Sequence, residues 1–292
     1  MNIRIVQRRE LDEARYHQCI ADSKMPLPYA FAPHLDMVAP HWKVLVYEDY
    51  EMVFPFAYNR KWLGIPRVVQ PQFCQQLGLF GRYQSDPVFV KASLEKLGEL
   101  YFRVMVQLNA TNPEPKCEGW TFRWRDNYEL DLSPEYEAIF HRFRRGHKHV
   151  IRQARKVHRL ERGEMTGAAF VAGWSRYAVD ESPALLEQLI GYYGTEHVYT
   201  AYLSNGHLGA AAFFVPLSHF LPGKAERLVY LAGWTTPEGR ESRAMHFLLD
   251  RVIAMYAGSG AILDFEGSEL PGPAMFFRGF RPERRPYLLA RR

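Results

Sequence analysis

Two carboxylates stand one residue apart in a segment that otherwise resembles a buried strand. Asp264 and Glu266 alternate with Leu263 and Phe265, and successive side chains of a strand point to opposite faces. Both acids would therefore share one face, at the strand end where α/β proteins usually place their sites. Burial and a neighbouring carboxylate both raise the pKa of an acid, so one of them could accept a proton from an amine near neutral pH. Alternatively, one acid caps the next turn and the other pairs with Arg278.

A second candidate site is the turn inside LVYLAGWTTPEGRESRAMHFLL, residues 228–249. A turn containing Gly239 and Ser242 between a strand and a helix would leave backbone N–H groups for a phosphate, aided by the helix dipole. Arg240 and Arg243 could add charge-assisted hydrogen bonds. The alternative is an ordinary turn in which Ser242 caps the helix. Neither G-x-x-x-x-G-K-[ST] nor G-x-G-x-x-G occurs, so kinases and Rossmann dehydrogenases lack support.

A strongly basic segment lies in the middle of the chain. Between Ala138 and Leu160 there are eight Lys or Arg residues and no acid, whereas the net charge of the whole chain is +5. Ser133-Pro134 predicts the start of a helix with an apolar stripe and a basic opposite face. That face could neutralise the phosphates of tRNA, of coenzyme A or of an anionic lipid precursor. Alternatively, it is a solvated helix face.

The composition predicts a folded cytoplasmic protein of one large or two medium domains. Of its 292 residues 47% are hydrophobic and 24% charged. Cys19, Cys74 and Cys117 are far apart and odd in number, which argues against a disulfide framework and against a zinc site. The histidines show no metal-ligand spacing, so we expect no metal. We also expect neither a signal peptide nor a transmembrane segment, because no apolar stretch of the required length occurs.

The order of the predicted elements suggests a duplicated α/β unit. Hairpins are predicted over 43–60 and 197–217, the second turning at Asn205-Gly206. Strands are predicted over 102–110, 121–132, 225–236, 261–268 and 286–292. Helices are predicted from Asp86-Pro87 to Tyr101, from Ser133, over 167–180, 183–194 and 240–260, with helical turns over 273–280. A domain boundary falls between residues 132 and 133.

Three local patterns resemble the GNAT acyltransferase superfamily, and in particular its Fem-like branch of tandem GNAT domains. Residues 142–156, RFRRGHKHVIRQARK, are similar to the Fem-type helix R-x-x-I-[RK]-x-A-x-K. Residues 264–280, DFEGSELPGPAMFFRGF, are similar to the run D-F-x-G-S…G-x-x-x-F-[KR]-x-x-F. The strand–helix–strand segment over 230–265 is similar to the cofactor-side unit. The resemblance implies an α/β (α+β) fold of two GNAT-like domains, each a mixed, mostly antiparallel sheet flanked by helices: 1–132, degenerate, and 133–292, which carries the activity.

The resemblance also implies transfer of an acyl or aminoacyl group to an amine on a small molecule or on a cell-wall or lipid precursor. The donor would be acyl-CoA, such as acetyl-CoA, or aminoacyl-tRNA. The sequence departs from the superfamily's loop [QR]-x-x-G-x-[GA], which leaves this choice open. The expected catalytic residues are Asp264, Glu266 and Ser268; the cofactor-binding residues Gly239, Arg240, Ser242 and Arg243; and the substrate-binding residues Tyr230, Trp234, Phe276, Phe277 and Arg278. The alternative is a non-catalytic protein that holds nucleic acid or an anionic surface through residues 141–159.

Overall fold

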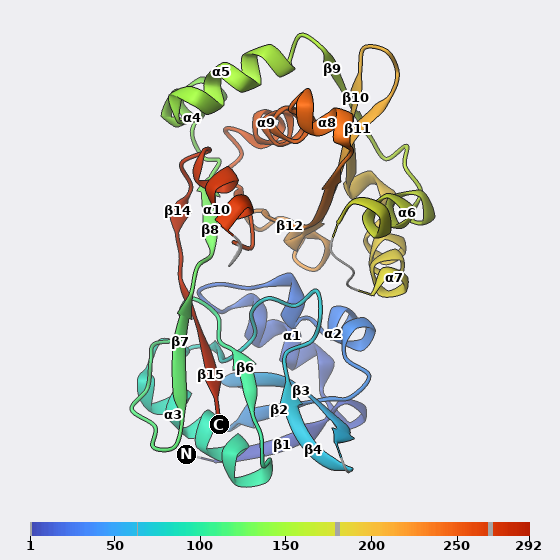
Figure 1. Cartoon of the computed structure of the whole chain (residues 1–292). Helices are drawn as coiled ribbons and strands as arrows, with labels where there is room; N and C mark the ends of the chain where they lie inside the picture. The colour runs from blue at the N-terminus through green and yellow to red at the C-terminus, as the bar shows by residue number, and fades with distance from the viewer. Residues whose placement is uncertain (1, 63, 179–181, 268–270) are drawn as a thin grey trace. The chain divides into compact units, whose positions relative to one another are not determined.

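The computed structural model of the chain describes residues 2–62, 64–178, 182–267 and 271–292. Its contacts divide the chain into two compact units, residues 1–126 with 285–292 and residues 127–284 (Figure 1). This division differs from a boundary at 132/133. The reason is that the last strand of the chain pairs with strands of unit 1, whereas the strand that begins at Tyr128 pairs within unit 2. The strand predicted over 121–132 is accordingly two strands.

The described residues of unit 1 form two antiparallel sheets and three α-helices. The first sheet has the order β1-β2-β3-β4, with β5 beside β3: β1 (Ile3–Gln7), β2 (Trp42–Tyr47), β3 (Met52–Trp62), β4 (Ile65–Val69) and β5 (Phe80–Gly81). The second has the order β6-β15-β7: β6 (Met105–Gln107), β15 (Tyr287–Arg291) and β7 (Thr121–Arg125). The helices are α1 (Glu13–Ala21), α2 (Ala32–Val38) and α3 (Pro87–Leu100). The predicted hairpin over 43–60 is confirmed as β2 and β3.

Helix α3 begins where its sequence predicts. The Asp86 side chain accepts the N–H of Val88 at 2.9 Å, and Pro87 occupies the first helical position. The buried side chains of Val90, Leu94 and Leu97 then pack in a core shared by both sheets of unit 1. The apolar stripe of the helix therefore supplies the core of this unit.

Unit 2 is built around one seven-stranded sheet. Its order is β14-β8-β13-β12-β11-β10-β9. The strands are β8 (Tyr128–Asp131), β9 (His158–Arg162), β10 (Val198–Leu203), β11 (Leu208–Pro216), β12 (Arg227–Thr235), β13 (Ile262–Asp264) and β14 (Glu283–Arg284). Among the described strands of this sheet only β12 and β13 pair in parallel. The predicted hairpin at Asn205-Gly206 is confirmed as β10 and β11.

The described residues of unit 2 form seven α-helices: α4 (Tyr136–Arg142), α5 (Arg145–Ala154), α6 (Gly167–Tyr177), α7 (Pro183–Tyr193), α8 (Pro237–Glu241), α9 (Ala244–Tyr256) and α10 (Pro271–Arg278). In Figure 1, α9 lies on one side of β10–β12, and α6 with α7 on the other. Two neighbouring phenylalanines of β11 point to these two sides of the sheet. Phe213 contacts Phe170 of α6 and Tyr193 of α7, whereas Phe214 belongs to the core formed with α9.

The long basic helix predicted from Ser133 is broken in two. Residues Phe143 and Arg144 are extended, with ψ of 149° and 143°. The Phe143 ring is buried edge-on against Phe280 at 5.2 Å, and the Arg144 N–H donates to the Gly279 carbonyl at 3.0 Å. These tertiary contacts take the place of the backbone hydrogen bonds that would continue the helix past Arg142.

The helix predicted over 240–260 is likewise divided into α8 and α9, at Arg243, whose φ is +65°.

Candidate active site

An aromatic cluster forms around the parallel strands of unit 2. The ring of Phe277, on α10, stacks on Phe265 with 5.0 Å between centroids and meets Tyr230 of β12 edge-on at 5.8 Å. Burial raises the pKa of the Tyr230 hydroxyl, which therefore stays protonated at neutral pH. This hydroxyl contacts the Met245 sulfur at 3.9 Å. The structure thus brings together two of the predicted substrate-binding residues, Tyr230 and Phe277.

A β-bulge in β12 separates Trp234 from this cluster. Tyr230 pairs with Phe214 and Ala232 with Phe213, so that Leu231 is an extra residue on β12. Because one extra residue reverses which side chains face each side of a sheet, Trp234 lies on the α6 face, opposite Tyr230. There it is 4% exposed and donates its indole N–H to the Phe170 carbonyl at 3.0 Å. Trp234 is therefore a packing residue of that face.

Asp264 is held in a buried ion triad. The Arg227 Nη1 donates to Asp264 Oδ2 at 2.7 Å and to Glu129 Oε1 at 2.8 Å, and Asp264 is 1% exposed. Burial raises the pKa of Asp264 and Glu129 adds to this, while the Arg227 guanidinium opposes both. Burial works against the charge of Arg227, but the two carboxylates outweigh it and raise its pKa. The triad joins β8, β12 and β13. The sequence does not predict Arg227 and Glu129 as part of the site. The one available signal is the position of Arg227 at the start of the otherwise apolar strand β12.

Glu266 does not share a strand face with Asp264 as the alternation predicts. Strand β13 ends at Asp264, and Glu266 has a φ of +57°, in the left-handed region. Its backbone N–H donates to Asp264 Oδ1 at 3.0 Å. Since Glu266 is half-buried, it keeps an access to solvent that Asp264 lacks. Ser268, the third predicted catalytic residue, lies outside the described residues.

The two phenylalanines of α10, Phe276 and Phe277, contact different side chains. Phe276 is half-buried and lies edge-on to His246 of α9, 4.8 Å between centroids. His147 of α5 contacts the same pair and bonds the Phe276 carbonyl through Nε2 at 3.0 Å. Burial, with the charge of Arg243 and the neighbouring His147, lowers the pKa of His246 to about 3, so its ring is neutral at physiological pH. These two histidines were not predicted as part of the site.

Arg278, the last predicted acceptor residue, lies beside Tyr128 at the start of β8. Its Nε donates to the Tyr128 hydroxyl at 2.7 Å, and its guanidinium carbon lies 5.4 Å from the centre of that ring. The aromatic partner holds the guanidinium at the edge of the seven-stranded sheet, where β8 lies between β13 and β14. Arg278 therefore belongs to the β8 side of unit 2.

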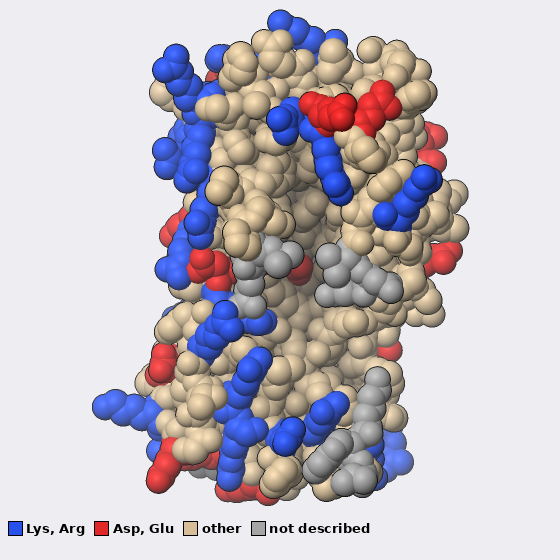
Figure 2. All heavy atoms as spheres, viewed as in Figure 1, with Lys and Arg blue, Asp and Glu red and all other residues tan. Residues whose placement is uncertain are grey.

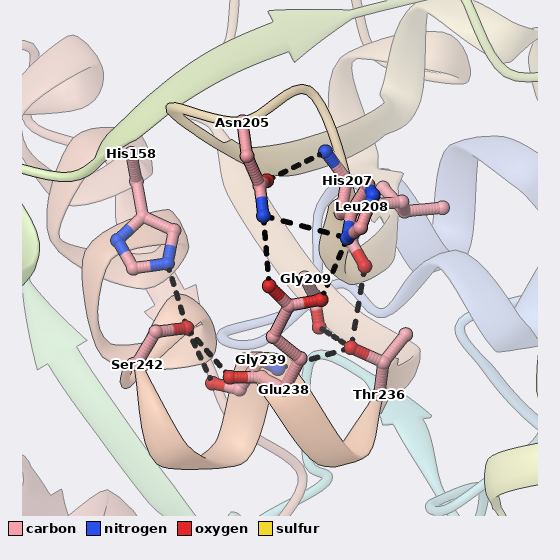
Figure 3. A network of polar contacts seen from close by, with 9 residues as sticks. All are labelled: His158, Asn205, His207, Leu208, Gly209, Thr236, Glu238, Gly239 and Ser242. Carbon is pink, nitrogen blue, oxygen red and sulfur yellow. Dashed lines mark hydrogen bonds and ion pairs between the residues drawn. The ribbon is translucent and has the colours of Figure 1, made fainter.

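The predicted phosphate-binding turn is occupied by its own polar network (Figure 3). Thr236 caps α8 by accepting the Gly239 N–H at 3.0 Å, and Glu238 bonds Asn205 and His207 of the β10–β11 turn. The Ser242 hydroxyl donates to the Glu238 carbonyl at 2.8 Å and also lies 3.1 Å from His158 Nε2. Glu238 and Ser242 therefore fasten the turn to the sheet, and the Gly239 N–H is used by the cap of α8.

Gly239 is required by a close approach of α8 to β11. A Cβ at this position would lie 1.9 Å from the Gly209 carbonyl oxygen. Gly239→Ala should therefore destabilise unit 2 by about 1–3 kcal/mol, as measured by denaturant unfolding. Gly191→Ala, at a helical position where an added Cβ would meet no atom beyond its own helix backbone within 4 Å, is the matched control and should gain about 0.5–1 kcal/mol. Equal stability of the two variants would contradict the close contact.

The two arginines of the turn remain on its surface. Arg240 is exposed, and its Nη2 reaches the Tyr177 carbonyl at 3.4 Å. Arg243 is exposed at the N-terminal end of α9, where no side chain caps the helix. Of the four predicted cofactor-binding residues, these two keep side chains that could reach a phosphate.

Neither metal-site geometry nor a membrane-spanning helix occurs in the described part of the chain. Over residues 2–62, 64–178, 182–267 and 271–292, His, Cys, Asp and Glu side chains form no group of three or more that could hold a metal ion. No helix within those ranges is both long enough and apolar enough to span a bilayer.

The fold is similar to solved structures over its whole length, although no family model and no curated protein sequence matches the chain. FemX superposes with a TM-score of 0.66 at 10% identity, over 99% of this chain and 97% of that one. The C-terminal domain of a putative lysylphosphatidylglycerol synthetase from Agrobacterium fabrum gives 0.58 at 13%, over 96% and 91%. A GNAT-family acetyltransferase from Colwellia psychrerythraea gives 0.55 at 12%, over 100% and 99%.

The chain has a Fem-like, tandem GNAT-type fold. The predicted fold class is thereby confirmed, with mixed, mostly antiparallel sheets flanked by helices. At these identities the likeness concerns the fold. Within the GNAT-type fold of unit 2, the parallel pair β12–β13, the aromatic cluster and Glu266 make up the candidate site.

Proposed function

We propose that the protein is an N-acyltransferase that moves an acyl or aminoacyl group to an amine. The observation that carries the proposal is the whole-chain likeness to FemX and to a GNAT-family acetyltransferase. A third neighbour is the C-terminal domain of a putative lysylphosphatidylglycerol synthetase, a name that denotes an aminoacylated lipid as product. We therefore propose an amine on a small molecule, or on a lipid or cell-wall precursor, as acceptor.

In the proposed reaction the acceptor nitrogen attacks the donor carbonyl, and the carbon–sulfur or carbon–oxygen bond to the leaving group breaks. The nitrogen must lose a proton, and we assign this proton to Glu266, directly or through water. Asp264 is unsuited to this role because it is buried and bonded to Arg227. It positions Glu266 instead, by accepting the backbone N–H of that residue.

The aromatic side chains would form the acceptor side of the site. Tyr230 and Phe277 supply an apolar wall with one neutral hydroxyl, which can donate a hydrogen bond to a developing oxyanion. Phe276, half-buried against His246, would extend this wall. Arg278 would supply a positive charge to the acceptor beyond its contact with Tyr128.

For the donor we propose acyl-CoA, with aminoacyl-tRNA as the other possibility. Either donor carries phosphates, for which Arg240 and Arg243 are the available cations of the α8 turn. Gly239 would act by allowing α8 to approach β11, and Ser242 by holding the turn, rather than by direct contact with phosphate.

A second candidate function is binding of RNA through α5. In and next to this helix, from the end of α4 to just beyond α5, the exposed cations are Arg142, Arg144, Arg145, Arg152 and Lys156, and no ion pair involves them among the described residues. Figure 2 shows Lys and Arg side chains gathered where Figure 1 shows α4 and α5. By contrast, Arg155 is bonded to the buried Asp250 at 2.8 Å and belongs to the packed side.

A ligand-binding screen with the full chain tests both candidates. We expect acetyl-CoA or CoA to raise the Tm, and Arg240→Gln/Arg243→Gln to abolish that rise. Arg142→Gln/Arg145→Gln serves as the matched control with the same charge change. If tRNA alone binds, with an affinity that falls steeply from low to physiological salt and is lost in the α5 variant, RNA binding replaces the CoA assignment.

A further inference from the structure

We propose that unit 1 contains a binding groove for the phosphate headgroup of an anionic lipid at a bilayer surface. The groove has a volume of about 330 Å³ and is lined by four arginines and four apolar residues: Arg67, Arg103, Arg291, Arg292, Val68, Val69, Val104 and Met105. None of these eight side chains is acidic. The proposal does not depend on acyl transfer, because the groove lies within unit 1 and the candidate active site within unit 2.

The floor of the groove is fixed by backbone hydrogen bonds. The Val68 N–H donates to the Arg103 carbonyl at 3.0 Å, and Val104 exchanges two bonds of 3.0 Å with Arg292. Three segments far apart in the sequence, at β4, β6 and β15, thus carry their arginines to one place. Figure 2 shows Lys and Arg side chains gathered where Figure 1 shows these strands.

The side chains of Arg67 and Arg292 are held in place by their neighbours. Arg67 donates Nε to Asn59 Oδ1 at 2.9 Å, and no described residue accepts a bond from its Nη atoms. The guanidinium of Arg292 lies against α3 at Gly98, where a Cβ would be 2.0 Å from its Nη1. No ion pair involves Arg67, Arg291 or Arg292 across the described ranges. Guanidinium groups without carboxylate partners, such as those of Arg67 and Arg291, are suited to a phosphate.

Exposed apolar side chains adjoin this charge. A smaller hollow shares Arg67 and Arg103 with the groove and is completed by Ile65, Pro66 and Phe102. Phe102 is 71% exposed and Ile65 is 40% exposed. Large apolar side chains that remain in water next to a basic groove favour an amphipathic partner. In a bilayer surface the guanidinium groups would meet headgroup phosphates while these two side chains enter the acyl boundary.

The same features argue against RNA at this groove. A nucleic acid spreads its phosphates along a strand, whereas Arg67, Arg103 and Arg291 line one short groove. Ile65 and Pro66 also offer aliphatic surface, which suits acyl chains better than base stacking. The exposed cations around α5 have one such apolar neighbour, Val157, which is 39% exposed against 71% for Phe102, and they provide a comparison within the same protein.

Vesicle co-sedimentation of the full chain tests the proposal. We expect binding to vesicles of phosphatidylcholine mixed with phosphatidylglycerol, and none to phosphatidylcholine alone. Arg67→Gln/Arg291→Gln should weaken binding about 30-fold, since each basic residue near an anionic surface contributes about 1 kcal/mol. Arg142→Gln/Arg145→Gln, with the same change in net charge, should bind like the wild type. An equal loss in both double variants, or a loss in the α5 variant alone, would overturn the assignment of the groove.

Phe102→Ser separates a lipid from free phosphate. This side chain is exposed, so its replacement should leave the fold intact, and circular dichroism checks that it does. We expect vesicle binding to fall several-fold while calorimetric titration with inorganic phosphate is unchanged. If the variant binds vesicles like the wild type and inorganic phosphate binds as tightly as the vesicles do, the ligand is a soluble phosphate and the lipid proposal fails.

Discussion

Arg227→Met should destabilise unit 2 by about 3–5 kcal/mol and lower its Tm by roughly 10 °C. The replacement leaves the carboxylates of Asp264 and Glu129 buried without the guanidinium that lies 2.7 and 2.8 Å from them. Uncompensated buried charge is among the most costly single changes in a protein interior. Thermal and denaturant unfolding of the variant measure the effect.

Acidification should reduce this loss. Burial raises the pKa of Asp264, so in the absence of Arg227 the folded chain binds a proton more readily than the unfolded chain. A carboxyl group whose folded pKa is raised contributes stability at low pH and loses it as the pH rises. The deficit of the variant should therefore be largest at neutral pH and smaller below it.

Two further variants identify the cause of the loss. Arg159→Met removes an arginine of the same sheet whose side chain is 62% exposed, and we expect a change within about 0.5 kcal/mol. The triple replacement Arg227→Met/Asp264→Asn/Glu129→Gln should be more stable than Arg227→Met, because no buried charge remains. If Arg227→Met is as stable as the wild type, the triad contributes nothing to the stability of the fold.

Glu266→Gln should lower kcat for amine acylation about 100-fold or more, which is the usual effect of losing a general base. Its fold should survive, because the backbone N–H that bonds Asp264 is unchanged by the substitution. Steady-state kinetics with the donor identified by the ligand screen measure the change. We expect KM for the donor to stay close to the wild-type value.

The control for this variant is Glu164→Gln, at an exposed position of unit 2, which should keep full activity. Asp264→Asn provides a second comparison. It should mainly reduce stability and disturb kcat only through the position of Glu266. Wild-type kcat in a folded Glu266→Gln variant would remove this carboxylate from the mechanism and leave the acyl-transfer proposal to the other groups of the site.

Local patterns in the sequence predict many of the elements correctly. Asp86-Pro87 marks the start of α3, and Asn205-Gly206 marks the turn between β10 and β11. Each signal acts through bonds within a few residues, as in the cap bond from Val88 to Asp86. The GNAT-type fold could be predicted for a similar reason, since its motifs are continuous stretches of chain. The structural likeness to FemX confirms that prediction.

Contacts between distant residues determined what the sequence alone could not. Alternation places Tyr230 and Trp234 on one face, but the bulge at Leu231 moves Trp234 to the other. Helical periodicity continues through Phe143, but the bond from Arg144 to Gly279 ends the helix there. In the acidic segment, spacing alone predicted two equivalent carboxylates. The packing of β8 and β12 beside β13 makes Asp264 an ion-paired core residue and leaves Glu266 as the candidate base. The sequence alone could not distinguish the two acids, because burial and charge pairing depend on neighbours far away in the chain.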